Sequence, residues 1–186
     1  EVTPAPGVVI DLDAVGARRG TLVTSACGVC GRRSIDALLA ARAALDVGET
    51  RVTASTLSRC VAAMRAAQRL FDETGGCHGA SLYTAAGEHL LTHEDIGRHN
   101  AVDKVVGAML LARRVPLGGH LLAVSGRAGF EIVQKAHAAG IPVVAAVGAP
   151  SSLAVDLARR ANVTLAGFAR GDAFTLYSAP ERVVPG

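Results

Sequence analysis

Short apolar segments alternate with amphipathic segments through the C-terminal half of this 186-residue chain. Residues 121–125 and 143–147 are almost entirely apolar, and helical patterns follow them at 130–138 and 151–160. Strand–helix–strand units of this kind pair their strands in parallel through right-handed crossovers. Continuous apolar strands require a sheet that is covered on both faces. The alternation therefore predicts a layered α/β fold.

The same patterns extend through the rest of the chain. Apolar side chains recur at helical spacing within residues 55–73, which predicts one helix with Cys60 packed on its apolar face. Ala86-Gly87 predicts a hairpin turn. The remaining expected elements are strands at 8–12, 21–24, 80–84, 88–92, 163–168 and 173–177, and helices at 34–45 and from Asn100 onward.

Composition excludes several classes of protein. Half of the residues are apolar but only 3% are aromatic, so alanine, valine and leucine must form the core. The net charge of +3 is too small to predict nucleic-acid binding. No apolar run reaches the roughly 18 residues that cross a bilayer, and no secretory signal is visible. The four cysteines are too few for a disulfide framework, which favours a reducing cytoplasm.

The segment 27–33 reads Cys-Gly-Val-Cys-Gly-Arg-Arg. Its glycines favour a turned loop, and its arginines favour the thiolate forms of Cys27 and Cys30. Thiolates are both nucleophiles and metal ligands. The segment is therefore interpreted as half of a zinc site, a dithiol redox pair or a sulfur carrier, with a buried structural pair as the plainest alternative.

Residues 93–100 form the densest polar cluster of the chain, between an expected strand and an expected helix. Asn100 is expected to cap that helix, with Asp103 in its first turn. His93 and His99 are too far apart in sequence for a helical zinc motif, which needs histidines four residues apart. We expect this cluster to be part of a functional site, because function concentrates in such loops.

Glycine-rich turns follow two of the expected parallel strands, at 125–129 and 148–152. Ligands of open α/β sheets gather at the carboxyl ends of strands, and helix N-termini favour anions. The turns therefore predict a phosphate-bearing ligand. Taken alone, Ser151 and Ser152 are more often plain helix caps than ligand-binding residues, whereas Arg127 stands near glycines that give it no packing role.

Cys77 and His78 would complete a Cys₃His zinc set with Cys27 and Cys30. The spacing matches no standard zinc module, and no glutamate follows His78 as zinc deaminase chemistry requires. We therefore expect no stoichiometric zinc. A zinc-stabilised nucleotide-binding module stays as the alternative. A thioredoxin-like oxidoreductase is third, because Gly31 and the arginines favour a loop over a helix start.

These motifs together resemble those of the formate dehydrogenase accessory sulfurtransferases, the FdhD family. The resemblance rests on residues 25–31, 75–78, 93–104, 125–127, 149–154, 168–172 and Tyr177, and so covers essentially the whole chain. Members carry a further region ahead of the cysteine loop, and this chain opens on Glu1 without Met, so a preceding segment is expected to be missing. Cys77 stands where a small or hydroxyl residue is expected.

The resemblance implies a three-layer α/β/α fold with a mixed, mostly parallel sheet, similar to the cytidine deaminase-like fold without its zinc site. Residues 1–50 would form an N-terminal segment with the cysteine loop, and 51–186 the α/β domain. The family forms homodimers.

The implied activity is a sulfur relay. A cysteine desulfurase would pass persulfide sulfur to Cys27 or Cys30. The chain would then deliver it to the molybdenum (or tungsten) of a bis-molybdopterin guanine dinucleotide cofactor for formate dehydrogenase, and GDP would mimic one end of that cofactor. The expected cofactor-binding residues are His93, Asp95, Arg98, His99, Ser125, Gly126, Arg127, Ser151 and Ser152.

Overall fold

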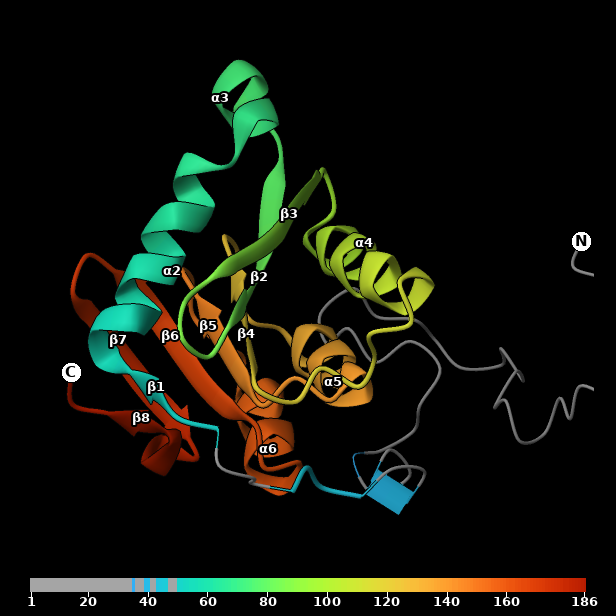
Figure 1. The fold of residues 1–186 in the computed structure, drawn as a ribbon, viewed down its shortest axis with the longest axis vertical. Helices are drawn as coiled ribbons and strands as arrows, with labels where there is room; N and C mark the ends of the chain where they lie inside the picture. Colours follow the sequence, from blue (N-terminus) through green and yellow to red (C-terminus); the bar gives the residue numbers. More distant parts are fainter. Residues whose placement is uncertain (1–34, 36–38, 41–42, 47–49) are drawn as a thin grey trace, which may run out of the picture.

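The computed structural model describes residues 35, 39–40, 43–46 and 50–186 (Figure 1). The strands expected at 8–12 and 21–24 and the cysteine segment 27–33 lie outside the described residues, as does most of the helix expected at 34–45. The other expected strands are all present, with ends that shift by up to three residues.

A six-stranded sheet forms the centre of the molecule, in the order β3-β2-β4-β5-β6-β7. β4, β5 and β6 pair in parallel, while β2 runs antiparallel to both β3 and β4, and β7 runs antiparallel to β6. β3 therefore points the same way as the three central strands. The strands are β2 (His78–Thr84), β3 (His89–Asp95), β4 (His120–Val124), β5 (Val143–Ala146), β6 (Thr164–Arg170) and β7 (Ala173–Ser178).

Helices cover both faces of this sheet (Figure 1). α2 (Ala54–Ala66) packs on β2, β4, β5 and β6 from one side. α4 (Arg98–Leu111), α5 (Phe130–Ala139) and α6 (Ser152–Arg160) lie on the other side, where α4 contacts β2 and β3, and α6 contacts β6 and β7. The three-layer α/β/α class expected from the sequence is confirmed. A short parallel pair, β1 (Val52–Thr53) with β8 (Val183–Val184), and a 3-10 helix η1 (Pro180–Arg182) complete the chain.

The central strands divide the core into two clusters because successive side chains point to opposite faces. Leu121 and Ala123 of β4 pack in the cluster on the α2 side, whereas Leu122 and Val124 pack in the cluster beneath α4, α5 and α6. All four are at most 3% exposed. This double burial explains why β4 and β5 are continuously apolar in sequence.

The single helix expected over 55–73 is wrong, because the chain breaks at Gln68 into α2 and a separate helix α3 (Arg69–Thr74). Gln68 has a non-helical backbone (φ −83°, ψ 78°), and its side chain is only 1% exposed. A Cβ atom on Gly79 would lie 2.7 Å from the Gln68 side chain, so the two residues pack in close contact. This tertiary contact overrides a local pattern that reads as one helix.

The start of α4 also differs from the sequence prediction. Gly97, not Asn100, occupies the N-cap position. Asn100 lies within the first turn and donates from Nδ2 to Asp95 Oδ1 at 3.0 Å. Asp95 Oδ1 also accepts the Gly97 N–H at 2.9 Å, so a strand residue binds the backbone that enters the helix, while no side chain caps its first N–H groups from the N-cap position.

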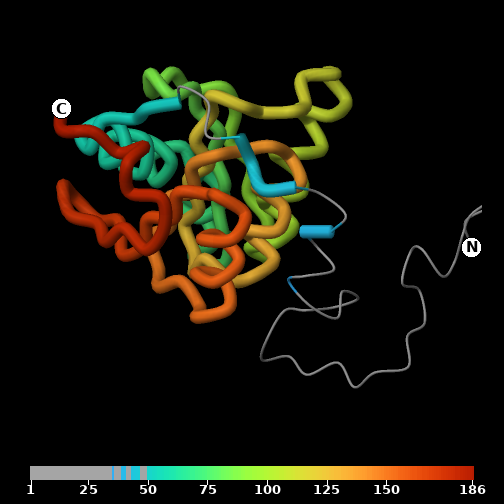
Figure 2. The backbone as a smooth tube through the Cα atoms, turned by 90° about the horizontal axis from the view of Figure 1, so that it is seen from below, coloured from blue at the N-terminus to red at the C-terminus, as the bar shows by residue number. Residues whose placement is uncertain are grey.

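Residues 43–46 attach to the end of the sheet where β5 and β6 begin. Leu45 donates its N–H to Ala161 O at 3.0 Å, and its carbonyl accepts from Asn162 Nδ2 at 3.0 Å. His137 Nε2 lies 2.8 Å from Ala43 O. In Figure 2 this short segment runs beside the orange part of the backbone. The division of the chain near residue 50 stays a prediction.

Within the part of the chain that the structure describes, no helix has both the length and the apolar character needed to cross a bilayer.

Replacing Leu122 by Ala should destabilise the protein by about 2–5 kcal/mol, because Leu122 is fully buried and truncation leaves a cavity. Leu111→Ala is the matched control, since that side chain is 87% exposed at the end of α4 and should change stability by less than about 0.5 kcal/mol. Urea unfolding measures both. Equal effects would contradict the placement of β4 in the centre of the sheet.

Candidate anion-binding site

The turns after β4 and β5 pack backbone against backbone at one edge of the sheet. Gly148 donates its N–H to Gly126 O at 3.0 Å, and Ser151 donates to Ala128 O at 3.1 Å. A Cβ atom at position 148 would meet the Cα and N of Arg127 at 3.0 Å. Any larger residue at position 148 would crowd this backbone, so glycine is favoured there. The contact joins the two turns that the sequence predicts as anion-binding.

A polar cavity of about 280 Å³ lies at this edge. Three guanidinium groups line it, from Arg98, Arg127 and Arg170, and among the residues that the structure describes no carboxylate lines it. The cavity therefore carries a concentration of positive charge that favours an anion with several oxygen atoms. The remaining lining residues are His78, Ser125, Gly126, Val147 and Gly148.

The topology brings the three arginines together from distant parts of the chain. Arg98 is the first residue of α4, Arg127 lies in the turn after β4, and Arg170 ends β6. Because β3, β4 and β6 point the same way, residues that follow or end them share one edge. Arg98 Nε is buried and has no hydrogen-bond partner among the described residues. An unpaired buried donor of this kind is costly, and an oxygen atom of a bound anion would satisfy it.

An irregularity in β6 precedes Arg170. The pairing with β7 shifts register between Gly167 and Arg170, and Phe168 has a positive φ of 54°. Phe168 donates its N–H to Gly148 O at 3.2 Å, which connects β6 to the turn after β5. Bulges of this kind redirect side chains near functional sites. The bulge accounts for the presence of Arg170 at the cavity.

Ser125 joins the start of β2 to the end of β4. Its Oγ accepts the Gly79 N–H at 2.8 Å, and its own N–H donates to Gly79 O at 3.0 Å. The hydroxyl hydrogen remains available to a ligand. A Cβ atom at Gly126 would lie 3.3 Å from His78 Nδ1, so the imidazole ring rests directly against the turn. This contact positions His78 in the cavity wall.

A second, mainly apolar cavity of about 510 Å³ adjoins the polar one. The two share His78, Ser125, Val147 and Arg170 among their lining residues. Val61 and Met64 of α2 and Phe71 of α3 provide apolar walls. The pair of cavities suits a ligand that has an anionic end and a flat, less polar end.

Two cysteines lie among the described residues, and both are free thiols. Cys60 is 2% exposed, and burial raises the pKa of its thiol to about 11. The prediction that Cys60 is part of the core is confirmed. Cys77 is half-buried and lines the apolar cavity, with its Sγ 3.9 Å from Thr74 Oγ1.

Asp95 is directed toward α4 and away from the cavity lining. Its carboxylate lies 2.7 Å from Lys104 Nζ. The hydrogen bond from Lys104, with those from the Gly97 N–H and Asn100, lowers the pKa of Asp95 to about 2. The residue therefore stays ionised and stabilises the start of α4, the helix that carries Arg98. Its expected role in cofactor binding stays a prediction.

His99 faces α5. Its Nδ1 lies 2.6 Å from Glu131 Oε2, and both side chains are about one quarter exposed. Burial lowers the pKa of His99, while the Glu131 carboxylate opposes that shift. His99 does not line the polar cavity, so within the described residues its main contact is structural.

Three other expected residues lie apart from the polar cavity lining. His93 pairs with Ala80 in the β2–β3 hairpin. Ser151 caps α6 by accepting the Ala154 N–H at 3.2 Å, as expected for a plain helix cap, and Ser152 is the exposed first residue of that helix. Of the residues predicted for cofactor binding, the structure therefore brings together Arg98, Ser125, Gly126 and Arg127.

His78 and Arg170 join this group although they are not among the cofactor-binding residues predicted from the sequence. Both stand in segments that carry the family resemblance, 75–78 and 168–172, although neither is among the polar residues 93–100 or in the glycine-rich turns. Those motifs could have singled them out, and strand order shows why they meet: β2 starts, and β6 ends, at the edge where the glycine-rich turns lie.

Comparison with known proteins identifies the family. A family model described as FdhD/NarQ matches residues 8–184. This chain belongs to the FdhD/NarQ family. The FdhD resemblance drawn from the sequence motifs is thereby confirmed. The FdhD/NarQ match also includes the cysteine segment, which lies outside the described residues.

Relatives in the FdhD/NarQ family are about 50% identical to this chain over the aligned residues. A protein of Streptomyces avermitilis named sulfur carrier protein FdhD is 49% identical over 185 residues, which cover 98% of this chain and 65% of the relative. A protein of the same name from Anaeromyxobacter dehalogenans strain 2CP-C is 52% identical over 190 residues, covering 98% and 66%. This chain therefore spans about two thirds of the length of these relatives.

A solved structure has the same fold over about three quarters of this chain. The crystal structure described as that of a formate dehydrogenase accessory protein from Desulfotalea psychrophila superposes with a TM-score of 0.69. The two sequences are 30% identical, and the match covers 76% of this chain and 60% of the other.

The Asp95 carboxyl should titrate near pH 2, and Lys104→Met should move its pKa up toward the ordinary 3.8, because Lys104 makes the largest contribution to the shift. A folded pKa below the unfolded one means that ionised Asp95 stabilises the protein above pH 3.8. That contribution is lost as the pH falls toward 2. Carboxyl-carbon NMR measures the titration.

The matched control is Lys135→Met, which removes a lysine that pairs with Asp103 and not with Asp95. It should leave the titration of Asp95 in place. A shift of the same size in both variants would show that net charge, not the contact with Lys104, lowers this pKa.

Proposed function

We propose that this chain is a sulfurtransferase that carries persulfide sulfur from a cysteine desulfurase to the molybdenum of a bis-molybdopterin guanine dinucleotide cofactor, for use by formate dehydrogenase. The observation that carries the proposal is the convergence of Arg98, Arg127 and Arg170 on one cavity beside an apolar one. Relatives named sulfur carrier protein FdhD support the sulfur-carrying part of it.

The two cavities together suit a nucleoside diphosphate unit. The phosphates would contact the arginines and the turn after β4, where guanidinium groups match phosphate oxygens in pairs. The Ser125 hydroxyl would donate to a phosphate oxygen. The base and sugar would extend into the apolar cavity between α2 and α3. A guanine dinucleotide has such a unit at the end of each pterin, so the cofactor would be held by its nucleotide while its metal end stays accessible.

Sulfur loading would occur on Cys27 or Cys30, which lie outside the described residues. A thiolate would attack the terminal sulfur of the persulfide on the donor enzyme. The donor S–S bond would break, the donor cysteine would leave as a thiolate, and a new S–S bond would form on the carrier. Arg32 and Arg33 would favour the attacking thiolate form.

The proposal assigns separate roles to two parts of the chain. Residues 1–50 would carry the sulfur, and residues 51–186 would hold the cofactor. A homodimer working in the cytoplasm with a desulfurase and a formate dehydrogenase follows the family resemblance. No role for nucleic acid or a membrane is included.

The alternative from another class is a zinc-stabilised nucleotide-binding module. In the described residues, no three or more His, Cys, Asp and Glu side chains cluster in a way that would hold a metal ion. Cys27 and Cys30 lie outside that search. Elemental analysis that found a tightly held zinc ion in each chain would favour the module over the carrier.

Arg127→Ala should weaken binding of GDP by about 1.5–3 kcal/mol, the usual contribution of hydrogen bonds to a charged group. Arg114→Ala is the matched control, because Arg114 is exposed beyond α4 and lines neither cavity. Isothermal titration calorimetry with GDP, ADP and inorganic phosphate measures the effect. Equal affinity for the three ligands would indicate a generic anion site, and no binding would remove the proposed cofactor site.

Replacing both Cys27 and Cys30 by Ala should abolish persulfide formation after incubation with a cysteine desulfurase and cysteine. Mass spectrometry of the intact protein would detect each added sulfur atom, and a formate dehydrogenase activation assay would follow its delivery. Cys60→Ala is the control, because a buried thiol should not be loaded. A double variant that still activated the dehydrogenase would overturn the relay.

A further inference from the structure

Helix α3 forms an outer wall of the apolar cavity, although none of its side chains is packed in the core. It comprises Arg69–Thr74, and none of its residues is buried. Its N-cap residue, Gln68, makes no side-chain capping hydrogen bond. A helix of this length is unstable in isolation, and it gains no large apolar burial here. Its position therefore depends on polar contacts from other elements.

Glu94, near the end of β3, supplies the main contact. Its Oε2 accepts the N–H of Leu70 at 2.9 Å, and its Oε1 accepts the N–H of Phe71 at 2.9 Å. Both oxygens of one carboxylate thus satisfy the free N–H groups at the start of α3. A negative charge also stabilises this end of a helix. The capping residue is more than twenty positions away in sequence, so the contact is tertiary.

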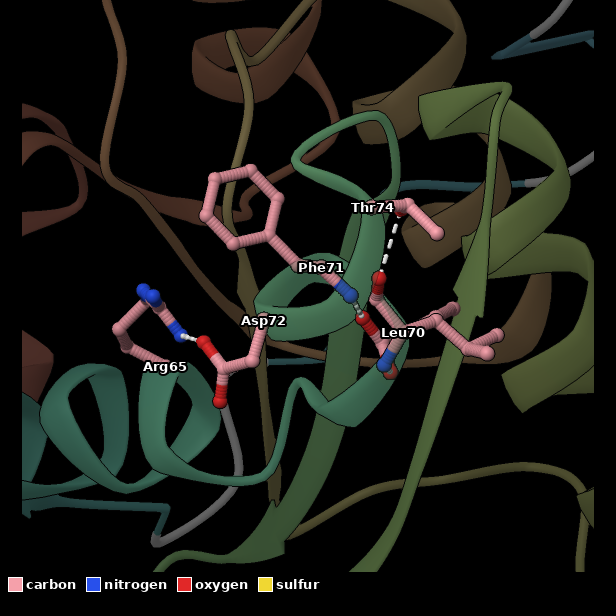
Figure 3. A network of polar contacts seen from close by, with 6 residues as sticks. Arg65, Leu70, Phe71, Asp72 and Thr74 are labelled. Carbon is pink, nitrogen blue, oxygen red and sulfur yellow. Dashed lines mark hydrogen bonds and ion pairs between the residues drawn. The ribbon is translucent and has the colours of Figure 1, made fainter.

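The other contacts of α3 are weaker. Arg65 of α2 pairs with Asp72 at 2.8 Å across the break between the helices, and its guanidinium lies 4.7 Å from the Phe71 ring centroid (Figure 3). Both side chains of the pair are more than half exposed, and exposed ion pairs contribute little. Thr74 Oγ1 donates to Leu70 O at 2.6 Å. Both residues belong to α3, so this bond does not connect α3 to another element.

The chain leads directly from α3 into the site. Phe71 lines the apolar cavity, and Gly75, which ends α3 with a φ of 64°, begins the stretch that leads through Cys77 to His78. His78 lines both cavities. Any displacement of α3 would therefore move the apolar wall first, while the three arginines come from other elements.

We propose that Glu94 is a positioning residue that holds α3 against the apolar cavity and thereby sets the affinity for the nucleoside end of the ligand. Glu94 lines neither cavity, so it acts through α3 and not by contact with the ligand. The inference rests on the proposed function for the identity of that ligand. It assigns to Glu94 a role separate from that of the arginines, which would bind the phosphates.

The test compares GDP with inorganic pyrophosphate by calorimetry on the full chain. Glu94→Ala removes both capping acceptors, a loss worth about tenfold in affinity if the cap is fully coupled to binding. GDP affinity should fall by about that factor, while pyrophosphate affinity should stay within about twofold. Glu94→Gln keeps one acceptor oxygen and should recover part of the GDP affinity.

Glu73→Ala is the matched control. It removes the same charge from the exposed surface of α3 without removing a capping contact, and should leave both affinities unchanged. Cys77 provides a second measurement, because its thiol lines the same cavity. Peptide mass spectrometry should show faster alkylation of Cys77 in Glu94→Ala than in the unmodified chain or in Glu73→Ala.

The outcomes separate the two proposals. If the unmodified chain binds neither GDP nor pyrophosphate, the proposed function is overturned. If it binds both and Glu94→Ala leaves GDP affinity and Cys77 alkylation unchanged, the role of Glu94 alone is overturned. An equal loss of affinity for both ligands would also overturn it, since that result would reflect general damage to the fold.

Discussion

The site depends on backbone hydrogen bonds that continue the parallel pairing of β4, β5 and β6 beyond the ends of the strands. Val147 donates to Val124 O at 3.0 Å, just after β5 has ended, and the contact from Gly148 to Gly126 follows. Phe168 then donates to Gly148 O, so the third strand joins the same network. These backbone bonds hold the two glycine-rich turns and the end of β6 at fixed separations. Arg127 and Arg170 reach a common cavity because their backbones are bound in this way.

Two adjacent carboxylates at the end of β3 organise the helices on either side of the sheet. Successive strand residues point to opposite faces. Glu94 accordingly caps α3, which follows α2 on one side, while Asp95 binds the start of α4 on the other. One dipeptide thus positions the apolar wall of the site through α3 and Arg98 through α4. Within the polar cluster that the sequence marks as functional, Glu94, Asp95 and His99 contact neighbouring elements, whereas Arg98 lines the polar cavity.

Local patterns predicted most of the architecture. The strands and helices after residue 75 form within three residues of their expected ends, because apolar periodicity reports directly on which face is buried. The sequence predictions are wrong where a residue distant in sequence determines where a helix begins or ends. Gln68 leaves the helix where it packs against Gly79. Asn100 is not the cap of α4 because the helix already begins at Arg98, after a turn in which Asp95 accepts the N–H of Gly97.

The sequence by itself determined the fold class, the family and the location of the glycine-rich turns, since each depends on residues close together in the chain. It also singled out Arg98 and Arg127. Only the tertiary structure decided that His78 and Arg170 join them, and that His99 faces Glu131. Strand order and the bulge in β6 create these neighbours. Both depend on contacts between distant segments, which no local pattern records.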